Sequence, residues 1–151
     1  MDKVKALFSD YTLFRDKNIG SYKPIEIIEL CALKHPHAKW LYKKAKNEKE
    51  KSDILRLSFL IENPDYWYLD CDAHLEEIPP IENGKPYFAE YKNACDGFII
   101  YGNNDPETFR AILGDIYEMT KKGRGLSITP YLTIKRQPNI IKKNYFKHKG
   151  V

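Results

Sequence analysis

The sequence predicts an α/β fold with a central, mostly parallel sheet flanked by helices. Candidate strands alternate with candidate helices along the chain, a pattern typical of parallel sheets. In addition, an aromatic strand at 66–70 ends in carboxylates, and polar side chains follow the strand predicted at 97–101. Because ligands of such sheets bind at the carboxyl ends of the strands, these polar residues also predict where a site would lie.

The whole chain, residues 1–151, is expected to form one domain. Its 151 residues are 42% hydrophobic and 30% charged, as in ordinary globular proteins. No run approaches the roughly 20 apolar residues that a membrane span requires, and the N-terminus lacks the apolar stretch of a signal peptide. The three cysteines are scattered and predict neither a zinc pair nor a disulfide framework. We therefore expect a cytoplasmic protein.

The first third of the chain is predicted to alternate between short strands and helices. Residues 4–9 form a brief candidate strand, and a loop follows it. Pro24 suits the first turn of a helix whose apolar face continues over 25–34. We interpret the His-Pro-His sequence at 35–37 as the end of that helix, and 38–43 as a short strand.

The middle of the chain carries the strongest patterns. From about Lys46 apolar residues recur at helical spacing, and the turn at 63–65 ends this predicted helix. The aromatic run at 66–70 is short and bounded by turn residues, which favours a buried strand. A loop at 78–86 and an extended segment at 87–91 are expected to follow.

The C-terminal part begins with the strand predicted at 97–101. A helix should come next, because Asp105 can cap it and Pro106 suits its first position. That helix is expected to run to about Lys121, and 131–135 could form a further strand.

The C-terminal segment, residues 121–151, is basic. It holds nine Lys or Arg residues and no Asp or Glu, although the net charge of the chain is only +4. This favours an anionic partner such as a diphosphate, a nucleic acid or a membrane surface. A solvated tail accounts for the same pattern equally well.

Asp70 and Asp72 form a DxD motif at the end of the aromatic strand. Residues two apart on a strand point to the same face, so both carboxylates could reach one ion. Their hard oxygen atoms suit Mg²⁺ or Mn²⁺, which commonly bridge to substrate phosphates. Two solvated acids at a strand end are the simpler interpretation of this motif taken alone.

Asp53 and Arg56 are three residues apart on the preceding helix and should share one face. A surface ion pair is the ordinary interpretation of this spacing. Their place just before the DxD motif adds a second interpretation. The guanidinium could clamp a phosphate, and the carboxylate could accept hydrogen bonds from sugar or ribose hydroxyls.

The segment 51–72 resembles the DXD glycosyltransferases of family 32 type, which include yeast mannosyltransferases and relatives of the glucosylating domain of large clostridial toxins. That family carries a Ser-Asp-x-x-Arg helix followed by a Tyr-Leu-Asp-x-Asp strand end. The matching residues here are Ser52, Asp53, Arg56, Tyr68, Leu69, Asp70 and Asp72. The segments 124–133 and 139–150 are similar to later, less specific parts of the family pattern.

The resemblance implies a GT-A-like fold of reduced size and a nucleoside diphosphate sugar as donor. Ser52, Asp53 and Arg56 would contact the donor, and Tyr68 would support the site. Mn²⁺ or Mg²⁺ would bind to the two aspartates of the DxD motif. The pattern stops before the family's His- and Trp-rich C-terminal element, so we expect a shortened site that a protein partner could complete. The acceptor is not predicted.

Two other functions are weighed against the glycosyltransferase. The first is a non-catalytic module with a degenerate GT-A fold that binds a nucleotide sugar or a protein. The second is a nucleic-acid-binding protein that uses the basic segment 121–151. We do not expect a nucleic-acid partner, because the rest of the chain is acidic and carries no nucleic-acid-binding motif.

Overall fold

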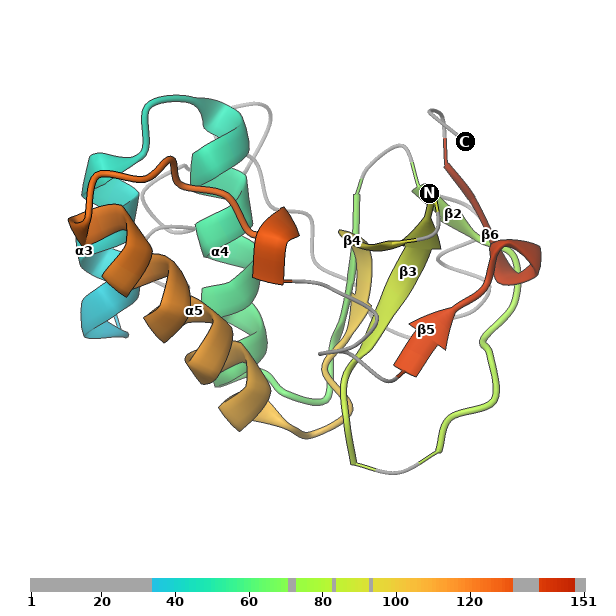
Figure 1. Ribbon diagram of the computed structural model, residues 1–151. Coiled ribbons are helices and arrows are strands. Elements are labelled where there is room, and N and C mark those ends of the chain that lie inside the picture. The colour runs from blue at the N-terminus through green and yellow to red at the C-terminus, as the bar shows by residue number, and fades with distance from the viewer. Residues whose placement is uncertain (1–33, 71–72, 83, 93, 132–138, 149–151) are drawn as a thin grey trace, which may run out of the picture.

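The computed structural model describes residues 34–70, 73–82, 84–92, 94–131 and 139–148, and it has a mixed α/β architecture. In Figure 1 a group of helices lies on one side of a sheet, and a small second sheet lies on the other side. The helices are α3 (Pro36–Lys44), α4 (Glu48–Glu62) and α5 (Pro106–Lys121). The main sheet contains β1 (Trp67–Leu69), β3 (Tyr87–Tyr91), β4 (Ala94–Tyr101) and β5 (Asn139–Ile141). The second sheet contains β2 (Ala73–Leu75) and β6 (Phe146–His148), and the 3-10 helices are η1 (Thr129–Tyr131) and η2 (Lys143–Tyr145).

The main sheet is mixed, so the expectation of a mostly parallel sheet is wrong for the described residues. Its strand order is β1-β4-β3-β5. β4 pairs antiparallel with both β1 and β3, and only β3 and β5 pair in parallel. β3 ends at Tyr91 and β4 begins at Ala94, so the connection between them is two residues long. So short a connection joins only antiparallel strands, because a parallel pair needs a crossover of about a dozen residues or more.

The helix α3 replaces the strand expected at 38–43. Pro36 begins the helix, and the Nδ1 atom of His35 accepts a hydrogen bond from the His37 backbone N–H at 3.2 Å. The His-Pro-His sequence therefore caps the start of a helix. Ala38 and Leu41, one turn apart, are both fully buried.

Five elements, α4, α5, β1, β3 and β4, confirm the sequence prediction in type, with shifted ends, whereas the sheet of β2 and β6 was not predicted. The helix predicted from about Lys46 is α4, capped by the Asn47 side chain, and the aromatic strand is β1. Asp105 caps α5 as expected. The predicted strand at 4–9 and the helix at 25–34 lie outside the described residues, as does most of 131–135. None of the described helices has the length and apolar character needed to cross a membrane.

Two apolar clusters hold the layers together, one on each face of the main sheet. The first joins the three helices to the sheet and includes Leu57, Phe88 and Phe109. The second lies under β2 and β6 and includes Leu75 and Phe146. The main sheet is therefore covered on both faces. The apolar side of α4 packs against the sheet.

The turn after α4 is fastened to the turn after β4. The Gly102 backbone N–H donates to the Tyr66 carbonyl at 3.0 Å, and the Asn104 N–H donates to the Pro64 carbonyl at 2.7 Å. A Cβ atom built on Gly102 would lie 2.3 Å from the Pro64 carbonyl oxygen. This close approach fixes how α4 enters β1, and so how the polar residues of the two elements face one another.

Replacing Gly102 with alanine is expected to lower the free energy of unfolding by about 1–3 kcal/mol, because the added methyl group must displace backbone. The control is Gly114→Ala in α5, where a Cβ atom meets nothing within 4 Å. That change should raise the free energy of unfolding by roughly 0.5–1 kcal/mol, since alanine favours a helix over glycine. Urea denaturation measures both, and equal effects at the two positions would contradict the contact.

Candidate functional site

Five of the six predicted site residues meet in one cluster between α4 and β1. Ser52, Asp53 and Arg56 come from one face of α4, whereas Tyr68 and Asp70 come from β1 and the residue just after it. The helix periodicity brings the first three together, and the alternation of the strand brings the last two to one side. We call these five residues the Arg56 cluster.

The guanidinium group of Arg56 is the centre of the cluster. Its Nε and Nη2 atoms donate to the carbonyl and the hydroxyl of Ser52 at 3.4 and 2.9 Å, and Nη1 donates to the Gly97 carbonyl at 2.6 Å. Nη2 also lies 3.4 Å from Asp53 Oδ1 and 3.6 Å from Asp70 Oδ1. Arg56 thus ties α4 to β4 and to the end of β1.

Tyr68 holds both the arginine and the aspartate. Its ring centroid lies 4.4 Å from Arg56 Cζ, a cation–π contact. Its hydroxyl donates to Asp70 Oδ1 at 2.6 Å. Burial raises the pKa of the Tyr68 phenol well above its ordinary value, so this group remains a hydrogen-bond donor at neutral pH.

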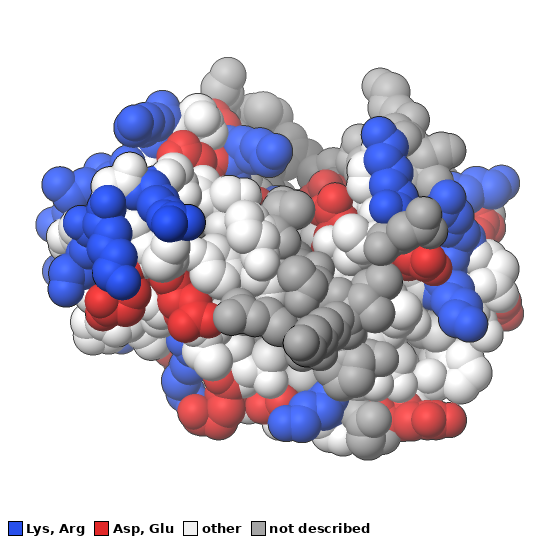
Figure 2. Space-filling view, in the orientation of Figure 1, with Lys and Arg blue, Asp and Glu red and all other residues white. Residues whose placement is uncertain are grey.

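The two carboxylates of the cluster differ in their access to solvent. The Asp53 side chain is 8% exposed, whereas that of Asp70 is 28% exposed. Asp70 is therefore the carboxylate of the cluster that is more accessible to a ligand. In Figure 2 acidic side chains are visible in the hollow between the helical layer and the sheet.

Burial raises the pKa of Asp53 above its ordinary value of 3.8, although the neighbouring Arg56 opposes this effect. At pH values between 3.8 and the pKa of Asp53 in the folded state, the folded protein therefore binds more protons than the unfolded chain. The contribution of Asp53 to the free energy of unfolding is fully present below pH 3.8. It is lost as the pH rises through the pKa of Asp53 in the folded state.

Asp53→Asn cannot ionise, and its stability should lack this pH dependence. We expect the free energy of unfolding of the wild type, relative to Asp53→Asn, to fall as the pH rises through that window and to be constant on either side. Denaturant unfolding at a series of pH values between 3 and 8 measures the difference. A relative stability of the wild type that rises with pH would show that the ion pair with Arg56 outweighs the burial.

Asp72, the second half of the DxD motif, lies outside the described residues, so the distance between the two aspartates is not defined. Among the residues that the structure describes, no group of three or more His, Cys, Asp or Glu side chains is placed to hold a metal ion. The described contribution to the predicted metal site is the carboxylate of Asp70, whose oxygen chemistry suits Mg²⁺ or Mn²⁺.

Sequence analysis did not predict the part that β4 plays in the cluster. The Gly97 carbonyl accepts from Arg56, and the Asp96 side chain accepts from the Gly97 N–H at 2.6 Å. A main-chain acceptor leaves no residue-type signal, and only the pairing of β4 with β1 brings it close. No family model matches the sequence, and the comparisons with curated proteins and with solved structures gave no match either.

Proposed function

We propose that this chain is a metal-dependent glycosyltransferase with a GT-A-like fold that takes its sugar from a nucleoside diphosphate donor. One observation carries the proposal: the Ser-Asp-x-x-Arg helix and the Tyr-Leu-Asp strand end meet in space. Residues of α4 and β1 that the family resemblance pairs by sequence are joined by the Arg56 contacts.

In this proposal Asp70 and Asp72 hold Mn²⁺ or Mg²⁺. The bound ion would supply positive charge that neutralises the diphosphate as it leaves the sugar. Asp70 fits this role because it is the exposed carboxylate of the cluster, and because Tyr68 fixes the position of its Oδ1 atom at 2.6 Å. Tyr68 is thus a positioning residue.

Arg56 is also assigned a positioning role. Three of its N–H groups donate to oxygen atoms of Ser52 and Gly97, and its Nη2 atom faces both carboxylates. Little of the guanidinium is left for a phosphate, so its contribution to binding comes chiefly through Asp70. Asp53 can still meet a sugar hydroxyl, because it also lines an open groove beside α4.

Calorimetric titration of nucleoside diphosphates and nucleotide sugars, with Mn²⁺ and with a chelator, tests the proposal. We expect one class of nucleoside diphosphate sugar to bind only when the metal is present. Release of the nucleoside diphosphate, followed with the same donor, then tests turnover. A folded protein that binds none of these compounds would overturn the proposal.

A non-catalytic module that binds a nucleotide sugar is the second candidate. The observation that favours it is the internal use of the cluster: Arg56 and Asp53 are nearly buried and serve the contacts between α4, β1 and β4. Metal-dependent binding with no release of nucleoside diphosphate, tested with a range of sugar acceptors, would favour the module over the enzyme.

A further inference from the structure

A basic groove lies next to the Arg56 cluster, at the end of the helical layer where α4 begins. Its volume is about 420 Å³, within the range of small-molecule sites. The walls come from the end of α3, the first two turns of α4 and the loop that follows α5. Asp53 lines this groove and also pairs with Arg56, so the two sites are adjacent.

The groove is lined by more positive than negative side chains. Its lining includes four basic residues, Lys44, Lys46, Lys49 and Arg124, against two acidic ones, Glu50 and Asp53. Of the acidic pair, Asp53 is already engaged by Arg56 at 3.4 Å. The groove therefore presents a surplus of positive charge to a ligand.

None of these four cations has an ion-pair partner among the described residues, and three of them, Lys46, Lys49 and Arg124, also lack a cation–π contact there. Neighbouring lysines differ in this respect. Lys51 lies 3.5 Å from Glu48, and Lys44 sits over the Trp40 ring at 5.4 Å. All three uncompensated side chains are exposed, so they are available to an anion in solution.

The backbone that borders the groove also favours an anionic ligand. The first turn of α4 opens onto it, and the start of a helix carries partial positive charge, although the Asn47 side chain accepts from the Glu50 N–H at 2.9 Å and Glu48 and Glu50 lie in this turn. The end of α5 also borders the groove, but its last carbonyl groups are already used. The Gly123 and Arg124 N–H groups donate to the carbonyls of Thr120 and Met119 at 3.0 and 3.1 Å. Gly123 makes this turn possible with a φ of 84°.

We propose that this groove binds the phosphate groups of a small ligand that is distinct from the sugar donor. Four cations lining one groove, together with a helix start, suit the dense negative charge of a phosphate or diphosphate. The volume suits a small molecule. Because the groove lies beside the proposed glycosyltransferase site, such a ligand would be a phosphate-bearing acceptor. Only this identification of the ligand as the acceptor rests on the proposed function.

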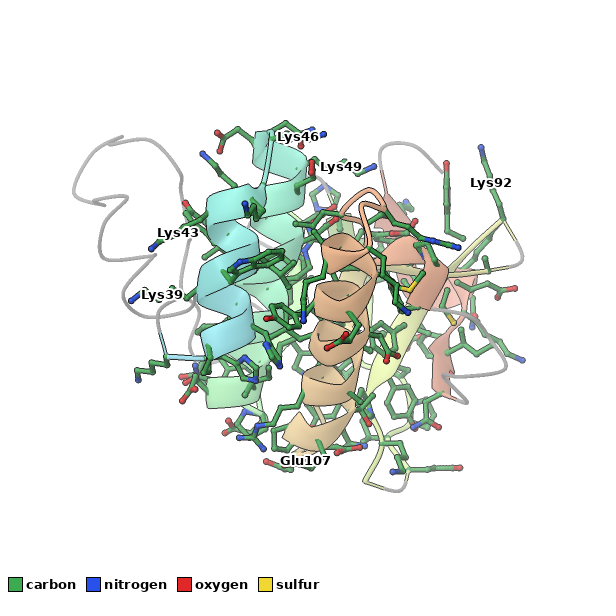
Figure 3. All side chains as sticks on the ribbon, turned by 60° about the vertical axis from the view of Figure 1, so that its left-hand side comes forward. Lys39, Lys43, Lys46, Lys49, Lys92 and Glu107 are labelled. Carbon is green, nitrogen blue, oxygen red and sulfur yellow. The ribbon has the colours of Figure 1, made fainter. Side chains whose placement is uncertain are left out.

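The chain offers a matched control for the charge. Figure 3 shows Lys46 and Lys49 at one end of the helical layer, whereas Lys39 and Lys43 point away from the body of the molecule on α3. All four side chains are exposed, and each pair removes the same charge when it is replaced. Lys39 and Lys43 do not line the groove.

The test is a titration of the full chain with inorganic pyrophosphate in the presence of a chelator, which leaves out the metal-dependent donor site. We expect Lys46→Ala/Lys49→Ala to bind pyrophosphate about tenfold more weakly or worse, since each charge-assisted hydrogen bond can contribute that factor. Lys39→Ala/Lys43→Ala and Asp70→Asn should bind as the wild type does. No binding by the wild type, or equal losses in the two lysine pairs, would overturn the proposal.

The source of the phosphate is tested by adding a nucleotide sugar and Mn²⁺ to the pyrophosphate complex. Retention of pyrophosphate supports a separate ligand. Its displacement would show that the groove holds the diphosphate of the donor, and would overturn the assignment to a second ligand. If no nucleotide sugar binds, the glycosyltransferase proposal fails, but the chelator titration still decides whether the groove binds phosphate.

Discussion

Replacing Arg56 with methionine is expected to lower the free energy of unfolding by roughly 3–5 kcal/mol at neutral pH, because it leaves charges without their partner in a nearly buried site. The Arg56 side chain is 10% exposed and that of Asp53 is 8% exposed. The Gly97 carbonyl would also lose the donor that now lies 2.6 Å away. Methionine keeps the aliphatic length, so the loss reports on the guanidinium more than on packing.

Arg110→Met is the matched control. Arg110 pairs with Glu107 three residues away on α5, the same spacing as in the Arg56–Asp53 pair, but the two side chains are 44% and 76% exposed. Surface pairs of this kind contribute less than about 1 kcal/mol. Urea denaturation of both variants measures the difference. The free energy of unfolding lost in Arg56→Met should shrink toward acid pH, where Asp53, whose pKa burial raises, takes up a proton. Equal losses in the two variants would contradict a central role for Arg56.

Asp70→Asn is expected to abolish metal-dependent binding of a nucleoside diphosphate sugar while the fold is kept. The amide retains the shape of the side chain and still accepts from the Tyr68 hydroxyl, but it lacks the charge that a divalent cation requires. Because Asp70 is 28% exposed, we expect a much smaller cost to stability than for Arg56. Calorimetric titration with Mn²⁺ measures the loss, and we expect it to be at least about 100-fold, the upper end of the losses known for residues that only support a metal ligand.

Glu76→Gln is the control for this change. The Glu76 side chain is 26% exposed, close to the value for Asp70, but it pairs with Lys147 of β6 at 3.8 Å, in the second sheet. The Glu76→Gln substitution therefore removes one negative charge of similar exposure outside the Arg56 cluster. Its binding of the donor should equal that of the wild type. A wild-type affinity in Asp70→Asn would mean that the metal, or the donor, binds elsewhere.

The fold could be predicted from the sequence wherever a local signal was strong. The apolar periodicity predicted α4, Asp105 and Pro106 predicted the start of α5, and the aromatic run predicted β1. α3 was missed because a proline can either follow the end of a helix or occupy its first turn, and the sequence was interpreted in the first way. The hairpin of β3 and β4 was missed although the few residues between the segments predicted at 87–91 and 97–101 are too short a connection for a parallel pair.

The candidate site was predicted in part, because helix and strand periodicities decide which side chains share a face. The periodicities place Asp53 beside Arg56 on α4, and Tyr68 beside Asp70 at the end of β1. They do not show that the two pairs contact each other. That step depends on the Gly102–Pro64 contact and on the Gly97 carbonyl, which are backbone features. The groove was missed because its cations come from three elements that only the tertiary fold brings together.

The central claim is that a metal-dependent donor site lies at the Arg56 cluster. It is tested most directly by the broadening that Mn²⁺ causes in the amide NMR signals of the protein with a nucleoside diphosphate sugar bound. We expect selective broadening at Ser52–Arg56 and at Tyr68–Asp70, with the signals of α5 near Glu107 left sharp. Broadening centred on another part of the described chain, or none while the sugar nucleotide is bound, would contradict it.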